Sequence, residues 1–379
     1  SHAASFALLV YASCWFTTFY PDVFCAALLR AQPMGFYAPA QLVRDAREHG
    51  VEVRAADINH SGWDCALEPA PFEAARIHHR HGEMRGVIRT QHAVRLGLRQ
   101  IKGLSSKRIE QLVARRGDGY HSVRDLWLRS GLNVDEIEKL AEADAFRSIG
   151  LDRRAALWAV RALDGRSAAE KLPLFDRPDL CLRDNEPETL LPVMPPGQHV
   201  VHDYQTLGLS LKAHPVSFLR ERLDRAGITP NARLAAVPGG RRVSVAGLVL
   251  VRQRPGKGNA IFLTLEDEGA VANIIVWARN FEKFRAVVMG AKFIRVTGKL
   301  QSESGVVHIV AEKAEDLTPW LSALLEERTP SAAVPAGIHG ESRASPEGRA
   351  ASFAPAGLGN AETLAVKAGK VMPKGRNFQ

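Results

Sequence analysis

The chain has 379 residues, of which 46% are hydrophobic and 24% charged, values typical of a soluble globular protein with two to three domains. Its net charge of +9 and its pI of about 9.6 favour a polyanionic partner. The four cysteines form no C-x-x-C pair, which argues against a zinc ribbon. Their scattered, mostly apolar-flanked positions are typical of reduced thiols in the cytoplasm.

Residues 1–90 are predicted to be helical and then mixed. The apolar stretch from Ala3 to Phe19 has no basic lead-in, which is wrong for a signal peptide, and its length is marginal for a membrane span. We therefore interpret it as a buried core helix and expect no membrane association. The chain begins at Ser1 rather than at a methionine, which suggests a fragment or a processed product.

Two helix starts and one strand are predicted next. Pro21 and Pro39 each stand where the first turn of a helix accepts proline, and Gly50 is a candidate cap for the second helix. Residues 51–54 then alternate as a short strand does.

Residues 91–165 are predicted to be a basic, helical region. Between residues 91 and 129 nine basic residues stand against three acids (Glu110, Asp118 and Asp125), so the difference is 9 − 3 = +6. The nine are Arg95, Arg99, Lys102, Lys107, Arg108, Arg115, Arg116, Arg124 and Arg129. Ser122 with Asp125, and Asn133 with Glu136, predict two helix N-caps.

A candidate phosphate-binding turn lies within this region. Gly103 can adopt positive φ just before a helix, which exposes backbone N–H groups that a phosphate can accept. Lys102, Lys107 and Arg108 would flank that phosphate, as in a helix-hairpin-helix element that grips nucleic-acid backbone without reading sequence. Ser105 stands where such a hairpin usually has a second glycine, and it could cap the helix instead. A plain helix N-cap with a solvated basic face is the alternative.

A second, similar unit follows, with a hairpin at residues 143–146 and a helix at residues 152–160. Because Glu142 and Asp144 would repel a phosphate there, we interpret this unit as a pseudo-repeat that packs against the first. The pair predicts a tandem helix-hairpin-helix DNA-binding region.

The remaining chain is predicted to hold three regions. Residues 166–240 read as a linker with two short helices, the second from Pro215 to about Gly227. Residues 241–327 contain five β-type runs with a helical piece at 281–288 between the third and fourth, which is the order of an OB-fold barrel. Residues 328–379, rich in Ala, Pro, Gly and Ser, are expected to be a disordered basic tail. The fold class is therefore multidomain α+β.

The OB-like segment supplies further candidate DNA-binding residues. Arg252, Arg254 and Lys257 lie in a basic, Gly-rich turn between the first two strands. Phe262 and Trp277 lie on the second and third strands, where OB-folds commonly bind oligonucleotides. We place Phe262 in the barrel core, and we leave Trp277 open between core and base stacking while keeping it among the candidates.

No catalytic or metal-binding residue is assigned. No closely spaced acids on neighbouring strands suit two-metal phosphoryl transfer, and no P-loop pattern occurs. The acids of residues 265–268 are better explained by a β-turn. His78, His79 and His81 could bind a metal, but a solvated loop is the preferred interpretation, because no carboxylate or cysteine ligand has useful spacing beside them.

Several segments resemble one known family. Residues 1–11 and 20–29 are similar to the fingers of bacterial C-family replicative polymerases. Other segments resemble the error-prone branch of that family, namely residues 31–47, 94–103, 119–127, 144–158, 207–215, the OB run through 277, and 372–378. The resemblance weakens only at residues 166–195 and 328–365.

The resemblance implies the end of the polymerase fingers in residues 1–90, a grip on template–primer duplex, and an OB domain near the single-stranded template. It implies translesion synthesis and DNA repair, with other translesion or replication proteins as partners. It also implies that the palm and its Mg²⁺-binding aspartates are absent from this chain. Thr17 stands where the family usually has a lysine.

Two other functions stay open. One is a stand-alone, non-enzymatic accessory protein that binds single-stranded nucleic acid through the same modules. The other is an RNA-binding OB protein, such as a tRNA-synthetase appendage.

Overall fold

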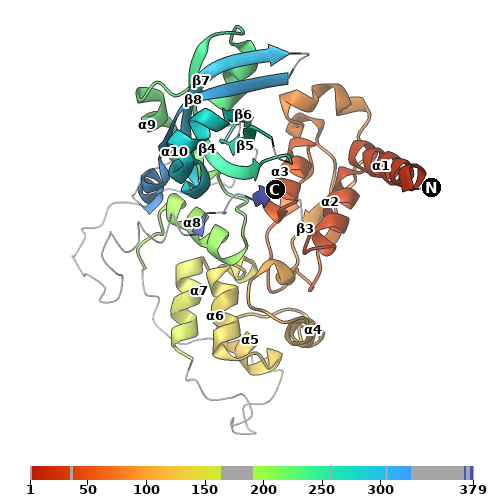
Figure 1. Ribbon diagram of the computed structural model, residues 1–379. Coiled ribbons are helices and arrows are strands. Elements are labelled where there is room, and N and C mark those ends of the chain that lie inside the picture. Colours follow the sequence, from red (N-terminus) through yellow and green to blue (C-terminus); the bar gives the residue numbers. More distant parts are fainter. Residues whose placement is uncertain are drawn as a thin grey trace, which may run out of the picture. The chain divides into compact units, whose positions relative to one another are not determined.

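The computed structural model describes residues 2–34, 37–163, 191–256, 258–303, 306–325, 371–372 and 376–378. The chain divides into two compact units (Figure 1). The first comprises Ser1–Met194 with Thr206–Leu211, and the second comprises Pro195–Gln205 with Lys212–Gln379.

The first unit is mainly helical. Its helices are α1 (His2–Phe19), α2 (Pro21–Arg30), α3 (Pro39–Glu48), α4 (Ser106–Ala114), α5 (Val123–Ser130), α6 (Val134–Glu142) and α7 (Arg153–Arg161). Short 3-10 turns occur at η1 (Ala74–Arg76), η2 (His79–Gly86), η3 (Leu98–Gln100) and η4 (Arg147–Ile149). Its three short strands are β1 (Val53–Arg54), β2 (Ala66–Pro69) and β3 (His92–Arg95).

The predicted helix starts and caps are confirmed. Helices α2 and α3 begin at their prolines, and Gly50 adopts φ +86° after α3. The backbone N–H of Asp125 donates to Ser122 Oγ, and Asn133 forms a capping box with Glu136. Strand β1 lies parallel to β3 and β2 lies antiparallel to it, which places the small sheet against the core of the helices.

Helix α1 is not the buried core helix that we expected. None of its residues is buried, and Leu8 and Tyr11 are 69% and 71% exposed. Its apolar composition therefore does not correspond to a buried position within the described chain. No helix among the described residues is both long and apolar enough to span a membrane.

The second unit is a β-barrel with short helices. Its strands are β4 (Arg242–Gln253), β5 (Ala260–Glu266), β6 (Val271–Trp277), β7 (Phe293–Glu303), β8 (Val306–Asp316) and β9 (Arg376–Phe378). Its helices are α8 (Pro196–Thr206), α9 (Arg220–Arg225) and α10 (Ala278–Gly290), with 3-10 turns η7 (Pro215–Leu219), η8 (Asn231–Ala236) and η9 (Thr318–Leu325).

Strands β4 to β8 form a closed five-stranded barrel with the predicted order. Strand β4 pairs with both β5 and β7, β5 pairs with β6, β8 lies antiparallel to β7, and β6 and β8 pair in parallel. Helix α10 lies between the third and fourth barrel strands, as the sequence predicted. Alternate residues of these strands fill one core.

Two expected boundaries are corrected. Much of the segment taken as a linker belongs to the second unit, because Val200, Leu219 and Leu223 are buried in one cluster with the barrel residues Leu248 and Phe293. The end of the expected disordered tail is also structured. Met372 is 1% exposed in that same cluster, and β9 pairs in parallel with β4. The rest of the expected tail, residues 328–370, lies outside the described residues.

Candidate nucleic-acid interface

The first hairpin turn has the geometry that the sequence predicted. Gly103 adopts φ +83°, and the exposed N-terminus of α4 follows it directly. Lys139 of α6 donates to the Gly103 carbonyl at 3.0 Å, and the Lys102 N–H donates to the Thr206 carbonyl at 3.1 Å. Ser105 stands at the N-cap in an extended conformation but makes no side-chain cap hydrogen bond. The backbone N–H groups of the first turn of α4 therefore remain the candidate phosphate contacts.

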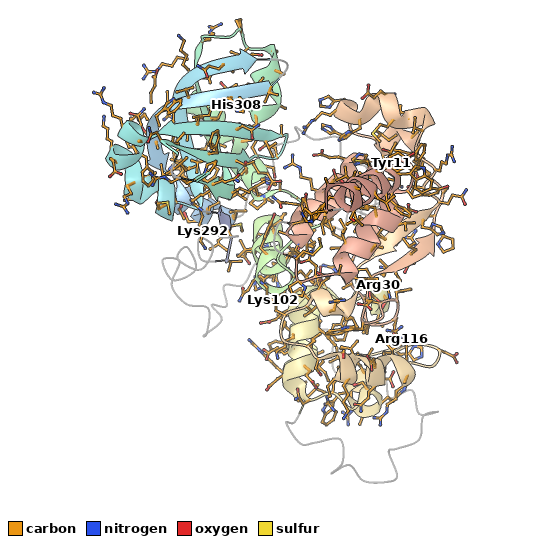
Figure 2. The ribbon with its side chains drawn as sticks, turned by 45° about the vertical axis from the view of Figure 1, so that its right-hand side comes forward. Tyr11, Arg30, Lys102, Arg116, Lys292 and His308 are labelled. Atoms are coloured by element: carbon orange, nitrogen blue, oxygen red, sulfur yellow. The ribbon has the colours of Figure 1, made fainter. Side chains whose placement is uncertain are left out.

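The three basic residues around this turn are placed differently. Lys107 is exposed on α4, and Lys102 is exposed beside the turn, although burial lowers the pKa of its ammonium group (Figure 2). Arg108 instead donates to both carboxylate oxygens of Glu136 and to the Gly131 carbonyl. The hydrogen bond to Glu136 raises the pKa of Arg108, so its guanidinium serves first as a clamp between α4 and α6. A phosphate at the N-terminus of α4 would have to share the Arg108 guanidinium with Glu136.

Residues 91–129 present less positive charge to a ligand than their formal charge difference of +6 implies. Four of the nine basic residues pair with carboxylates, as Arg95–Glu68, Arg99–Asp64, Arg108–Glu136 and Arg129–Asp125. Glu68, Asp64 and Glu136 lie outside the stretch, so they neutralise part of it. Arg129 also donates to the Arg115 and Arg116 carbonyls just after the C-terminus of α4.

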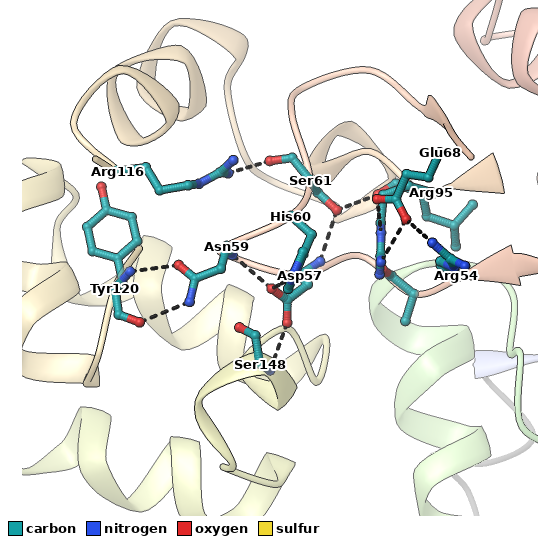
Figure 3. Close-up of polar contacts among 12 residues, drawn as sticks. Arg54, Asp57, Asn59, His60, Ser61, Glu68, Arg95, Arg116, Tyr120 and Ser148 are labelled. Carbon is teal, nitrogen blue, oxygen red and sulfur yellow. Dashed lines mark hydrogen bonds and ion pairs between the residues drawn. The ribbon is translucent and has the colours of Figure 1, made fainter. Parts of the chain in front are cut away.

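A buried carboxylate that the sequence reasoning missed holds the two hairpin units together (Figure 3). Asp57 is 5% exposed, and it accepts hydrogen bonds from the Asn59 N–H, His60 Nδ1 and the Ser148 N–H of the second hairpin. Asn59 in turn exchanges two hydrogen bonds with the backbone of Tyr120, at 2.7 and 2.9 Å. The only sequence signal was the presence of two Asx residues and a serine within residues 57–61, which is typical of a loop that bonds its own backbone.

Arg116, two residues after the end of α4, completes this network. Its guanidinium donates to the Ser61 carbonyl, and the Ser61 hydroxyl donates to the Leu96 carbonyl (Figure 3). Burial lowers the pKa of Arg116. Since Arg116 is tied to a loop, it is a structural residue of the hairpin region rather than a surface cation.

The second hairpin has the packing role that the sequence favoured. Asp144 adopts φ +62° in its turn, is 7% exposed and forms an ion pair with Arg147. Arg153, which is fully buried, donates to the Glu142 carbonyl. The Asp144 carboxylate thus stabilises its own turn, whereas Glu142 contributes a backbone carbonyl.

The basic turn between β4 and β5 is corrected at one position. Arg252 is 6% exposed and donates to the carbonyls of Val288 and Ala291 at the end of α10. Burial lowers its pKa, and its side chain is unable to reach a ligand at the surface. Arg254 is exposed and donates to the Gly258 carbonyl. Lys257 lies outside the described residues.

Both aromatic side chains of the second and third barrel strands lie on the outer face. Trp277 is 51% exposed at the end of β6, and Phe262 is 39% exposed on β5. The expected core position of Phe262 is therefore wrong, because its strand neighbours Ile261 and Leu263 point into the barrel instead. Exposed rings on a strand surface can stack on bases of any sequence.

The acids of residues 265–268 build a turn, as expected. Asp267 accepts the N–H groups of Gly269 and Ala270 at 2.9 Å each. Among the histidines, His81 stacks on His49 at 4.3 Å between ring centroids. Within the described residues, no three or more His, Cys, Asp or Glu side chains are arranged to hold a metal ion.

We expect Lys107→Gln to weaken duplex binding about equally across sequences. Each lost phosphate contact should reduce the slope of log K against log salt by roughly one unit. Fluorescence anisotropy over a salt series measures this slope, with Lys283→Gln on the exposed face of α10 as a matched control. A slope that equals that of the unmodified chain would exclude a phosphate contact for Lys107.

Two family models match parts of the chain. The helix-hairpin-helix motif matches residues 50–156, and the OB-fold nucleic acid binding domain matches residues 243–317. The first match begins well before the predicted region at residue 91, and it includes the Asp57 loop. Both confirm the predicted fold classes of these segments.

Curated relatives align with the chain from end to end. An error-prone DNA polymerase of Mesorhizobium japonicum is 69% identical over 100% of this chain and 34% of its own length. Error-prone DNA polymerase 1 of Rhizobium meliloti is 56% identical over 100% of this chain and 35% of its own length. The chain thus spans about a third of the length of these relatives.

Among solved structures, asparaginyl-tRNA synthetase of Pyrococcus horikoshii has a TM-score of 0.19 at 23% identity, covering 21% of this chain and 20% of its own. The Stn1–Ten1 complex of S. pombe has a TM-score of 0.19 at 22% identity, covering 20% of this chain and 58% of its own. Similarity at this level carries no argument about function.

Proposed function

We propose that the chain is the DNA-holding, C-terminal portion of a bacterial error-prone DNA polymerase. The proposal is supported by relatives of that name, which align with the whole chain over about a third of their own length. In this proposal the helix-hairpin-helix region contacts the phosphates of template–primer duplex, and the outer face of β5 and β6 holds single-stranded template. The observation that carries the proposal is the exposure of Phe262 and Trp277 on that face.

The hairpin part of the proposal rests on shape and charge together. The positive φ of Gly103 turns the chain toward the N-terminus of α4, and Lys107 is exposed in the first turn of the helix. A helix N-terminus favours an anion through its free N–H groups and its dipole. Such a contact positions the duplex without reading its sequence, as a polymerase that copies any template requires.

Nucleotide transfer is assigned in this proposal to the part of the polymerase that this chain does not cover. That part would supply the palm and the Mg²⁺ ions. Residues 1–90 would form the end of the fingers. From the sequence resemblance we further propose lesion bypass, DNA repair, a cytoplasmic location and assembly with other translesion or replication proteins. The relatives' name, "error-prone DNA polymerase", supports the error-prone synthesis alone.

A stand-alone single-strand-binding protein is the second candidate. It is favoured by the architecture of the second unit, whose barrel and flanking helices have hydrophobic clusters of their own. Both candidates use the same outer sheet face for DNA. They differ in whether the chain supports synthesis when it is joined to a palm domain.

We expect the isolated chain to bind template–primer DNA and to incorporate no nucleotide with Mg²⁺. A gel-based primer-extension assay measures incorporation, and anisotropy on the same DNA shows that the protein is bound. Clear extension by a homogeneous preparation would contradict the proposed division of labour. Absence of binding to both duplex and single strand would contradict DNA holding itself.

A further inference from the structure

A row of uncharged polar side chains crosses the outer face of the barrel. Thr264 of β5 is in register with Asn273 of β6, Asn273 with His308 of β8, and His308 with Gln301 of β7. Cross-strand partners in register lie on one face of a sheet, so these four residues form a continuous line over four strands. We call Thr264, Asn273, His308 and Gln301 the polar row.

The burial pattern shows that the polar row faces outward. Its members are half-buried or exposed, whereas the residues beside them along the strands, such as Leu265, Ile274, Leu300 and Ile309, are buried in the barrel core. Successive side chains of a strand point to opposite faces. The polar row is therefore a surface feature and no part of the core.

Apolar residues border the polar row on both sides, and the same flanking positions also hold charged residues, Lys299 in register with Val310 and Glu266 in register with Val271. Phe262, Ile275 and Val310 form the next row on the same face, two residues along each strand. On the other side, Val271 and Val306 are 37% and 47% exposed. Hydrogen-bonding groups set between exposed apolar and aromatic residues match a nucleobase, which has a polar edge and an apolar face.

His308, which is labelled on the barrel in Figure 2, has a ring nitrogen that lacks a hydrogen-bond partner within the described part of the chain. Its Nδ1 is shielded from solvent and has no hydrogen-bond partner among the described residues. A shielded nitrogen without a partner is unfavourable, so a ligand group that bonds to it would be stabilised. Asparagine, glutamine and neutral histidine each offer both a donor and an acceptor, as base edges require.

We propose that the polar row hydrogen-bonds to base edges of single-stranded DNA whose bases stack on Phe262 and Trp277, which gives the chain a base preference. The inference rests on the proposed function of this face. Phosphates are held mainly by Arg and Lys, whereas the polar row contains no charged side chain. The row therefore selects bases, while Lys107 and the α4 turn contact the backbone of duplex DNA.

The test compares the affinities of the full chain for labelled dT10, dC10 and dA10 at one salt concentration. We expect the unmodified chain to bind these oligonucleotides over a range of about tenfold, the discrimination typical of one good base contact. His308→Leu should narrow the range to within about twofold, and His308→Gln, which keeps a donor and an acceptor, should preserve most of it. His121→Leu, at an exposed histidine of the first unit, is the matched control.

The proposal is overturned if the unmodified chain binds all three oligonucleotides within twofold, or if His308→Leu leaves the range unchanged. Gln301 is exposed, so Gln301→Ala should leave the barrel core intact. This variant should also narrow the range of affinities for the three oligonucleotides. Replacing Phe262 and Trp277 by alanine should instead weaken binding to all three oligonucleotides. Unchanged affinity in that variant would contradict the proposed function of the face, and with it base stacking beside the polar row, whereas the His308→Leu comparison tests the polar row alone.

Discussion

Replacing Asp267 by alanine is expected to destabilise the second unit by about 3–5 kcal/mol, because it removes one of the two buried carboxylates that pair with Arg220 and also the acceptor of three backbone N–H groups. Asp267 is fully buried, and it accepts Arg220 Nη2 at 3.1 Å and the Asn231 N–H at 2.7 Å. Arg220, which is 4% exposed, also pairs with Glu268. The carboxylate thus joins α9 and η8 to the turn between β5 and β6.

The same arginine provides a matched control. Asp224 lies 3.5 Å from Arg220 Nη1, but its side chain is 55% exposed, so Asp224→Ala should cost less than about 1 kcal/mol. Hydrogen exchange of peptides from β5 and β6 measures the difference, with peptides of the first unit as an internal reference. Similar exchange in the two variants would show that the buried pair does not hold the turn.

Local chemistry made parts of the fold predictable from the sequence. The caps at Ser122 and Asn133 bond to residues three positions away, and Gly103 needs only its own backbone freedom to turn. The order of five strands with a helix after the third likewise follows from consecutive sequence patterns. Such features depend on neighbours in sequence, so a single sequence displays them.

Features set by distant partners were not predictable. Arg252 stands in a basic turn, yet it bonds to carbonyls that lie 36 and 39 residues further along the chain. Arg108 was assigned to phosphate, but Glu136 occupies its guanidinium. The role of Asp57 depends on Ser148, which is 91 residues away. Charge alone does not tell a surface cation from a structural one.

The sequence also did not predict which residues of a strand face the core and which face the surface. A shift of one residue moves a side chain from the core to the surface, and a short apolar run such as residues 261–265 does not fix that phase. Phe262 was placed inside for this reason, whereas the register of β5 with β6 places it outside. The error concealed half of the aromatic surface on which the proposed function depends.

Replacing both Phe262 and Trp277 by alanine is expected to lower the affinity for single-stranded DNA by about 30-fold or more. Stacking of one base on one aromatic side chain contributes about 1–3 kcal/mol, so loss of two rings removes about 2 kcal/mol or more. Both side chains lie on the outer face, so the barrel core should be retained. Trp158 of α7, which is 49% exposed in the first unit, gives the control variant Trp158→Ala.

The most direct test of DNA holding by two separate surfaces measures single-strand and duplex affinity for the same two variants. We predict that Phe262→Ala with Trp277→Ala loses single-strand binding and keeps duplex binding, and that Lys107→Gln does the reverse. The anisotropy of a labelled dT10 strand and of a labelled duplex, titrated with each folded variant, gives all four values. Equal losses on both DNA forms for either variant, or no loss of single-strand binding in the aromatic variant, would contradict the account.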